Sequence, residues 1–456
     1  MSKVISKAKN KVVFGCTACG AQASKWAGQC SDCQAWNTII ECTPRRNADR
    51  AGFSVTSQKV FSLGEIEASP IFRVPTALPE LDRVLGGGLV PGSVILMGGD
   101  PGIGKSTLLL QTLGTLATEH RVLYVTGEES VEQLGLRAKR LGIVPETQLR
   151  FYAQTDLSDI LQVMEQEQPQ IVVIDSIQTV FDTAVLGAAG AVNQVRECAS
   201  MLARFAKQTN TTILLVGHVT KSGEVAGPRT LEHIVDAVIF MEGQEDSRYR
   251  LLRSYKNRFG AANEMGVFMM TEKGLRGVTN PSAIFLSQRD TPVPGSAVVG
   301  LWEGTRPLLV ELQALVDDTH APNPRRLSLG IDANRLGMLL AVLNKHGKYL
   351  TYQQDVFVNV VGGVKITETS ADLACIMAVS SSLKNRAIAG DWVIIGEVGL
   401  AGEIRPVPFC IERIKEASQH GFKRACVPKK NVPKKGIEGV DIVGVDTLPD
   451  ALSLLF

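Results

Sequence analysis

Four continuous apolar runs lie in the middle of the chain, and each is short and followed by glycine or polar residues. Runs of this kind are typical of strands that are buried on both faces of a parallel sheet. The strands expected from them are 94–97, 121–126, 171–175 and 213–218. Residues 107–118, between the first two, are predicted to form a helix. The middle of the chain is therefore predicted to be an α/β domain.

The pattern differs on either side of this domain. Residues 45–59 are polar with few large apolar side chains, which is typical of a linker, and the prolines and glycine of 291–295 indicate a junction. Beyond that junction, alternating strands and a helix over about 370–383 are expected. A chain of 456 residues is long enough for several domains. We expect a module at 1–45, a linker at 46–60, an α/β domain at 61–286 and an α+β domain at 287–456.

Composition is that of an ordinary globular protein, with 45% hydrophobic and 21% charged residues. No stretch is long and apolar enough to span a bilayer, and the polar N-terminus lacks the apolar core of a secretory signal. A cytoplasmic protein without a membrane partner is therefore expected. The formal net charge is only +2, so any nucleic-acid binding must come from local basic patches or a ring channel.

Cysteines are concentrated near the N-terminus, where five of the nine fall within the first 42 residues. Two Cys-x-x-Cys pairs supply four thiolates, the set that a tetrahedral Zn²⁺ site needs. A redox pair is disfavoured because neither lies in a βαβ pattern, and four unrelated buried thiols are a weaker alternative. Trp26 and Trp36 either contact a nucleic acid or protein, or pack over the metal. The predicted zinc ligands are Cys16, Cys19, Cys30 and Cys33.

The first apolar run leads into a complete G-x-x-x-x-G-K-[ST] sequence that opens the predicted helix. Glycines let backbone N–H groups surround phosphate, and the helix N-terminus adds positive charge. Lys105 is expected to reach the β- and γ-phosphates of ATP, and Ser106 to bind Mg²⁺. The predicted nucleotide-binding residues are Gly99, Asp100, Pro101, Gly102, Ile103, Gly104, Lys105, Ser106 and Thr107.

Polar residues end the other predicted strands at the edge where open parallel sheets bind ligands. Asp175 ends the third strand and is expected to hold Mg²⁺ through its water shell. Glu128 follows the second strand and is expected to orient the attacking water, with Glu129 as the alternative. His218, at the end of the fourth, is either a γ-phosphate sensor or a solvated loop residue.

Two further segments carry a resemblance to known proteins. Residues 81–92, LDRVLGGGLVPG, are similar to the entry of RecA-type and KaiC-type cores, and residues 256–260, KNRFG, resemble the signature pentapeptide of the bacterial RadA (Sms) DNA-repair family. With the four-cysteine N-terminus, the resemblance covers nearly the whole chain. It implies an α/β fold in which a RecA-like P-loop ATPase core lies between a zinc module and a C-terminal domain.

This resemblance implies a motor similar to ring-forming replicative helicases, driven by ATP and acting in recombination and repair through branch migration. Its expected partners are single-stranded and branched DNA, further copies in a homo-hexamer, and recombinase or replication proteins. Lys256 and Arg258 then act at the nucleotide site between subunits, the alternatives being a solvated basic loop or a DNA-backbone contact. Lys221 and Arg229, in a glycine-rich basic stretch, are the candidates for contacts with DNA phosphates.

The C-terminal half is similar to Lon protease domains over residues 397–407. Ser370 falls at the nucleophile position, but alignment on Gly402 and Pro406 puts Ile411 where the dyad lysine is expected, and Lys415 is too late. A serine without a neighbouring base is a poor nucleophile. We expect a degenerate Lon-like α+β scaffold that adds basic surface for DNA, with these candidates: Lys345, Lys348 and Arg386. The alternative functions are an ATP-dependent serine protease and a KaiC-like regulatory ATPase.

Overall fold

The structure is a computed structural model that describes residues 13–16, 22–23, 25–31, 34–42, 72–145, 147–218, 230–243, 247–286, 291–320 and 323–456. The chain forms two compact units, Met1–Gly277 and Val278–Phe456. The division falls earlier than the expected boundary at 286/287. Residues of the 278–286 segment join the second unit because Ser282 donates a hydrogen bond to Glu416 at 2.8 Å and Phe285 is buried.

The N-terminal module contains a small antiparallel sheet in the order β2-β1-β3. Phe14 packs against a small buried cluster of Cys16, Cys30 and Ile39. The apolar cluster formed by the described residues of this module is small, which fits a module that depends on a bound metal. Its strands are β1 (Val13–Cys16), β2 (Gln22–Ala23) and β3 (Ile39–Cys42).

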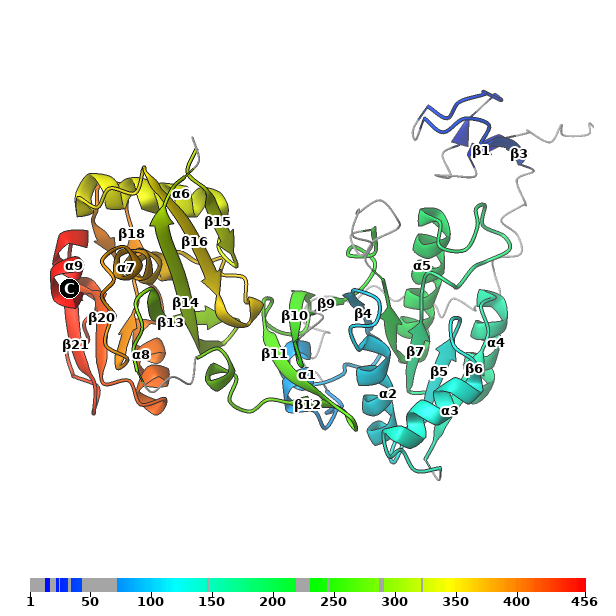
Figure 1. Cartoon of the computed structure of the whole chain (residues 1–456). Helices are drawn as coiled ribbons and strands as arrows, with labels where there is room; N and C mark the ends of the chain where they lie inside the picture. The colour runs from blue at the N-terminus through cyan, green and yellow to red at the C-terminus, as the bar shows by residue number, and fades with distance from the viewer. Residues whose placement is uncertain are drawn as a thin grey trace, which may run out of the picture. The chain divides into compact units, whose positions relative to one another are not determined.

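A nine-stranded sheet forms the core of the first unit, in the order β12-β11-β10-β9-β4-β8-β7-β5-β6 (Figure 1). The six strands from β9 to β6 are parallel, and β10, β11 and β12 continue the sheet antiparallel. The strands are β4 (Val94–Gly99), β5 (Val122–Thr126), β6 (Leu149–Ala153), β7 (Ile171–Asp175), β8 (Thr212–Val216), β9 (Ala237–Glu242), β10 (Tyr249–Asn257), β11 (Met265–Thr271) and β12 (Gly274–Gly277).

Both faces of this sheet are covered by helices, which is why its strands are continuous apolar runs rather than alternating ones. In β4, Ile95 and Met97 join a core with α1 (Pro79–Leu85), α2 (Lys105–Leu116) and α3 (Val131–Arg140). Val94 and Leu96 join the core on the other face, with α4 (Leu157–Glu167) and α5 (Val192–Thr209). The predicted α/β class of this unit is confirmed.

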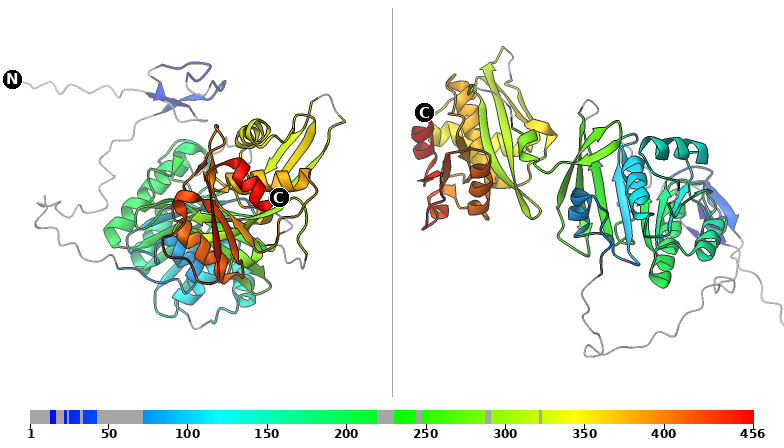
Figure 2. Two further views of the ribbon diagram at one scale, coloured as in Figure 1. Left: turned by 90° about the vertical axis from the view of Figure 1, so that its left-hand side faces the viewer. Right: turned by 90° about the horizontal axis from the view of Figure 1, so that it is seen from below.

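The second unit is built on a seven-stranded mixed sheet in the order β15-β16-β14-β13-β17-β20-β21, with α9 packed beside β21 (Figure 2, red). Its strands are β13 (Ser296–Glu303), β14 (Arg306–Asp318), β15 (Arg326–Leu329), β16 (Gln354–Val360), β17 (Trp392–Ile394), β20 (Arg424–Pro428) and β21 (Asp441–Val445), and β18 (Glu397–Val398) pairs with β19 (Ile404–Arg405). Its helices are α6 (Ala333–Val342), α7 (Asp372–Leu383), α8 (Cys410–Gln419) and α9 (Leu448–Leu455).

The expected helix near 370–383 is therefore present as α7, preceded by a 3-10 turn at Thr369–Ala371. Among the helices of the described ranges, none combines the length and apolar character that crossing a bilayer needs.

Gly295 and Gly421 offer a matched test of packing in this unit. Both have a left-handed backbone, with φ of 87° and 86°, so alanine at either should cost about 1 kcal/mol. A Cβ on Gly295 would also lie 2.2 Å from the carbonyl oxygen of Ala314, whereas none of the described atoms is within 4 Å at Gly421. We expect Gly295→Ala to lower the denaturation midpoint of the full chain much more than Gly421→Ala. Equal shifts would contradict this packing.

Candidate active site

The phosphate-binding loop runs from the end of β4 into α2. Gly99, Gly102 and Gly104 have φ of 146°, 75° and 117°, a region that L side chains rarely adopt. A Cβ on Gly99 would also lie 2.6 Å from the carbonyl oxygen of Met241 on the neighbouring strand. Three glycines are thus required by the shape of the loop, which leaves the backbone open for a phosphate at the start of α2.

Lys105, the first residue of α2, is buried within this loop. Its Nζ donates hydrogen bonds to the carbonyl oxygens of Gly99 at 2.7 Å and Asp100 at 2.8 Å. Burial lowers the pKa of Lys105 to about 8, against the opposing effects of Asp175, Asp100 and Glu128. The ammonium is therefore poorly solvated and already directed at the loop, so that a phosphate can replace weak partners with a strong one.

Asp175 lies at the carboxyl end of β7, as predicted, and is 7% exposed. Its Oδ2 accepts a hydrogen bond of 2.5 Å from the hydroxyl of Tyr124, while its buried Oδ1 has no partner among the described residues. Burial and the charge of Asp175 raise the pKa of Tyr124 well above its usual value. A buried carboxylate oxygen with a free lone pair is the donor that Mg²⁺ prefers, so the residues fit this ion.

Glu128 and Glu129, the two candidates for orienting water, have different environments. Glu128 accepts a 2.5 Å hydrogen bond from Ser176, the residue after Asp175, so its carboxylate lies beside the end of β7. Glu129 instead pairs with Arg137 of α3 at 2.6 Å. The geometry brings Glu128, rather than Glu129, together with the other candidate residues.

His218 joins two parts of the site and is not a solvated loop residue. Its Nδ1 lies 3.2 Å from Nζ of Lys105, and its Nε2 lies 3.2 Å from Oε1 of Glu128. Its carbonyl oxygen accepts a hydrogen bond from Gln178. A neutral ring accepting from Lys105 and donating to Glu128 satisfies all three side chains.

Lys256 and Arg258 lie at the opposite edge of the sheet. Asn257 pairs with Ala237 and Ala237 with Ile95, four residues before Gly99, which is about 13 Å along the strand. Lys256 donates to the carbonyl oxygens of Glu232 and Val235, and Arg258 pairs with Asp236 at 3.1 Å. Burial and the charge of Arg258 lower the pKa of Lys256. The structure does not bring these two cations to the phosphate loop of their own subunit.

The rest of the pentapeptide has a structural role that the sequence did not reveal. Asn257 donates to the carbonyl oxygen of Val84 and accepts from the backbone N–H of Phe259. A Cβ on Gly260 would lie 2.8 Å from Cα of Gly86, so the two backbones touch. The pentapeptide is thereby fixed against the glycine turn that follows α1.

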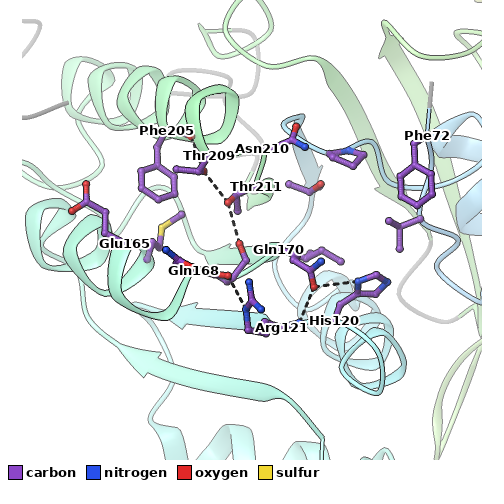
Figure 3. Close-up of a pocket in the computed structure, with 16 residues that line it drawn as sticks. Phe72, His120, Arg121, Glu165, Gln168, Gln170, Phe205, Thr209, Asn210 and Thr211 are labelled. Atoms are coloured by element: carbon purple, nitrogen blue, oxygen red, sulfur yellow. Dashed lines mark hydrogen bonds between the residues drawn. The ribbon is translucent and has the colours of Figure 1, made fainter. Parts of the chain in front are cut away.

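A cavity of about 710 Å³ lies away from the phosphate loop, at the edge where the parallel strands begin (Figure 3). Ile171 and Thr212, the first residues of β7 and β8, line it. Its polar groups bond to one another: His120 Nδ1 lies 3.3 Å from Gln170 Oε1, and Arg121 donates to the carbonyl oxygen of Gln168 (Figure 3). The predicted nucleotide-binding residues, 99–107, are not among the residues that line this cavity.

The predicted zinc ligands are only partly within the described residues. Cys16 and Cys30 are buried at 1% and 2% exposure in one small cluster, which fits a shared metal. Cys19 and Cys33 lie outside the described residues, as do the predicted DNA contacts Lys221 and Arg229. Trp26 and Trp36 are 62% and 70% exposed.

Arg413 is the residue that contacts Ser370 in the Lon-like domain, which corrects the expected alignment on Ile411. Its Nη1 lies 3.0 Å from Oγ of Ser370, while both terminal nitrogens bind Glu368 at 2.7 Å. Ile411 is 39% exposed because it lies on another face of α8. A guanidinium stays protonated and cannot act as a base. The alignment assumed that the spacing of Gly402 and Pro406 continues unchanged into α8. The register of α8 instead places Arg413, two residues after Ile411, against Ser370.

The other basic candidates of this domain, Lys345, Lys348 and Arg386, are exposed. Arg386 also donates a 2.6 Å hydrogen bond to the terminal carbonyl oxygen of Phe456, so that its guanidinium helps to hold the end of the chain.

The fold and the site define the class of this protein: an ATP hydrolase with a RecA-type P-loop core. The AAA domain family matches residues 63–224, the rubredoxin metal binding domain matches residues 14–41, and subunit ChlI of Mg-chelatase matches residues 338–431. The chain belongs to the RadA family of DNA repair proteins, as its resemblance to the family pentapeptide predicted, because it is similar to curated members over nearly its full length.

DNA repair protein RadA of Pseudomonas aeruginosa is 56% identical over 98% of this chain and 100% of that protein. The Escherichia coli protein of the same name is 55% identical, covering 97% of this chain and 98% of its own, and that of Bacillus subtilis is 46% identical, covering 98% of each. A solved KaiC-like protein from Pyrococcus horikoshii aligns at 21% identity over 46% of this chain and 100% of its own, with a TM-score of 0.39, too distant to bear on function.

Arg413→Leu should lower the free energy of unfolding by about 3 kcal/mol, because it leaves Glu368 without its buried partner. Lys415→Leu, the same type of change at an exposed position of α8, should cost no more than about 0.5 kcal/mol. Denaturant unfolding of the full chains measures both. Similar midpoints for the two variants would show that the contacts of Arg413 with Glu368 and Ser370 are not needed for stability.

Proposed function

We propose that this protein is a DNA-dependent ATPase of DNA repair, a ring-forming motor that drives branch migration of recombination intermediates. The observation that carries the proposal is the convergence of Lys105, Glu128, Asp175 and His218 at one edge of the sheet. Membership of the RadA family supports a substrate of branched or single-stranded DNA. The ATP hydrolase activity is the chemistry that such a motor needs.

In this proposal residues 99–107 bind the phosphates of ATP, with Lys105 on the β- and γ-phosphates. Ser106 and Asp175 hold Mg²⁺, which supplies neutralisation of negative charge on the transferring group. Glu128 accepts a proton from the attacking water and orients it. Cys16, Cys19, Cys30 and Cys33 hold a structural Zn²⁺, supported by the match of residues 14–41 to a metal-binding domain.

DNA contacts are proposed for the segment that follows His218. Lys221 and Arg229 neutralise DNA phosphates, which makes binding salt-dependent. His218 precedes this segment directly and contacts both Lys105 and Glu128. A change at the phosphates would therefore be transmitted through His218 to the DNA-binding segment.

Lys256 and Arg258 are proposed to act on the nucleotide of a neighbouring subunit. Their place at the sheet edge away from their own phosphate loop supports action across an interface, where a cation stabilises charge on the transferring phosphoryl group. A closed ring, which we take to be a homo-hexamer, gives every site such a neighbour.

Glu128→Gln should lower the rate constant for ATP hydrolysis at least about 100-fold, because the amide cannot accept the proton. Glu129→Gln is the matched control, and it should keep a rate within a few-fold of wild type since its carboxylate pairs with Arg137. Steady-state phosphate release measures both. The roles of the two residues would have to be exchanged if Glu129→Gln were the inactive variant.

Mixing two inactive variants tests catalysis between subunits. Lys105→Ala lacks phosphate contact and Arg258→Ala lacks the cation, yet a randomly mixed ring contains sites with an intact copy of each, about a quarter in a 1:1 mixture. We expect the mixture to hydrolyse ATP and each variant alone to be inactive. Lys207→Ala, which removes another cation near Asp236, should stay active. If the mixture stays inactive although the rings exchange subunits, Arg258 acts in the site of its own subunit or has no role in catalysis.

The function itself is tested by ATP hydrolysis with and without single-stranded DNA, at low and high salt. Stimulation by DNA that declines with salt is the expected result, because counterion release drives phosphate binding. Hydrolysis that is indifferent to DNA would favour a KaiC-like regulatory ATPase instead.

A serine protease is the other candidate, and the contact of Ser370 with Arg413 argues against it. Casein cleavage that requires ATP and is lost in Ser370→Ala would restore that candidate.

A further inference from the structure

The hydroxyl of Tyr124 contacts one of the two side chains assigned to magnesium, the carboxylate of Asp175. It donates to Oδ2 of Asp175 at 2.5 Å. Tyr124 is the third residue of β5, its side chain is fully buried, and its ring packs in the core that includes α2. One buried hydroxyl of β5 thus holds the carboxylate at the end of β7.

This hydrogen bond decides which oxygen of the carboxylate remains free. The one hydrogen of the phenol is donated to Oδ2 of Asp175. Oδ1 of Asp175 is buried and has no partner among the described residues. Asp175 therefore presents an oxygen with free lone pairs, the form in which oxygen ligands bind Mg²⁺.

We propose that Tyr124 is a positioning residue that orients Asp175 for Mg²⁺ without touching the metal or the nucleotide itself. The inference rests on the proposed use of Mg²⁺ by Asp175. Mg²⁺ demands nearly ideal octahedral geometry, so small rotations of the carboxylate weaken binding. Partners outside the ligand set fix such rotations in metal sites generally.

The test compares the affinity of the full-length protein for a non-hydrolysable ATP analogue in excess EDTA and in saturating Mg²⁺, by calorimetry. The ratio of the two affinities measures how strongly the metal is coupled to the nucleotide. Tyr124→Phe keeps the ring and removes only the hydroxyl. We expect it to reduce the ratio about 10-fold or more, as outer partners of metal sites do, with metal-free affinity unchanged.

Tyr152→Phe on the adjacent strand β6 is the matched control and should keep the wild-type ratio. An unchanged ratio in Tyr124→Phe overturns the proposal. So does an equal loss of affinity with and without Mg²⁺, because Tyr124 would then support the phosphate loop alone. If the wild-type protein itself shows no enhancement by Mg²⁺, the proposed magnesium site fails, which is a different result from the failure of Tyr124→Phe.

A double-mutant cycle with Asp175→Asn provides a second readout. If Tyr124 acts through Asp175, adding Tyr124→Phe to Asp175→Asn should change the ratio by much less than it does in the wild type. Fully additive losses would assign Tyr124 a separate structural role and overturn the proposal.

Discussion

Parallel pairing of β4, β5, β7 and β8 is the constraint on which the candidate site depends. Parallel strands end at the same edge, so residues that are far apart in the chain meet there: the phosphate loop after β4, Glu128 after β5, Asp175 at the end of β7 and His218 after β8. The pairing itself requires helices on both faces, because each strand is apolar on both sides. Packing of α2 and α5 against the sheet is therefore also what holds the candidate catalytic groups in place.

Burial changes the chemistry of Lys105. The Lys105 ammonium is desolvated inside the loop, which lowers its pKa to about 8, and nearby carboxylates offset part of that effect. Such a charge gains more from a phosphate than a solvated lysine would, since the low-dielectric surroundings strengthen the contact. Tyr124 of β5 donates a hydrogen bond to Asp175, and Ser176, directly after β7, donates one to Glu128.

The second unit contains a serine at a protease-like position whose neighbour is an arginine instead of a base. Ser370 occupies a position that resembles a protease nucleophile, but its hydroxyl contacts the guanidinium of a fully buried arginine. A lysine there could lose its proton, whereas Arg413 stays charged and pairs with Glu368. Instead of forming a reactive dyad with Ser370, Arg413 forms an ion pair with Glu368 that joins α8 to the segment before α7.

The sequence by itself determined the elements whose signals are local. Continuous apolar runs predicted the central strands, the spacing of glycines and Lys105 predicted the phosphate loop, and Asp175 could be placed because it directly ends a strand. Tertiary structure alone decided which side chains touch across elements. Strand order decided that Glu128 and Glu129 have different partners, that His218 contacts both Lys105 and Glu128, and that the Tyr124 hydroxyl binds Asp175. Helix register decided that Arg413 rather than Ile411 contacts Ser370. A linear pattern does not encode these, because they arise only when distant segments pack together.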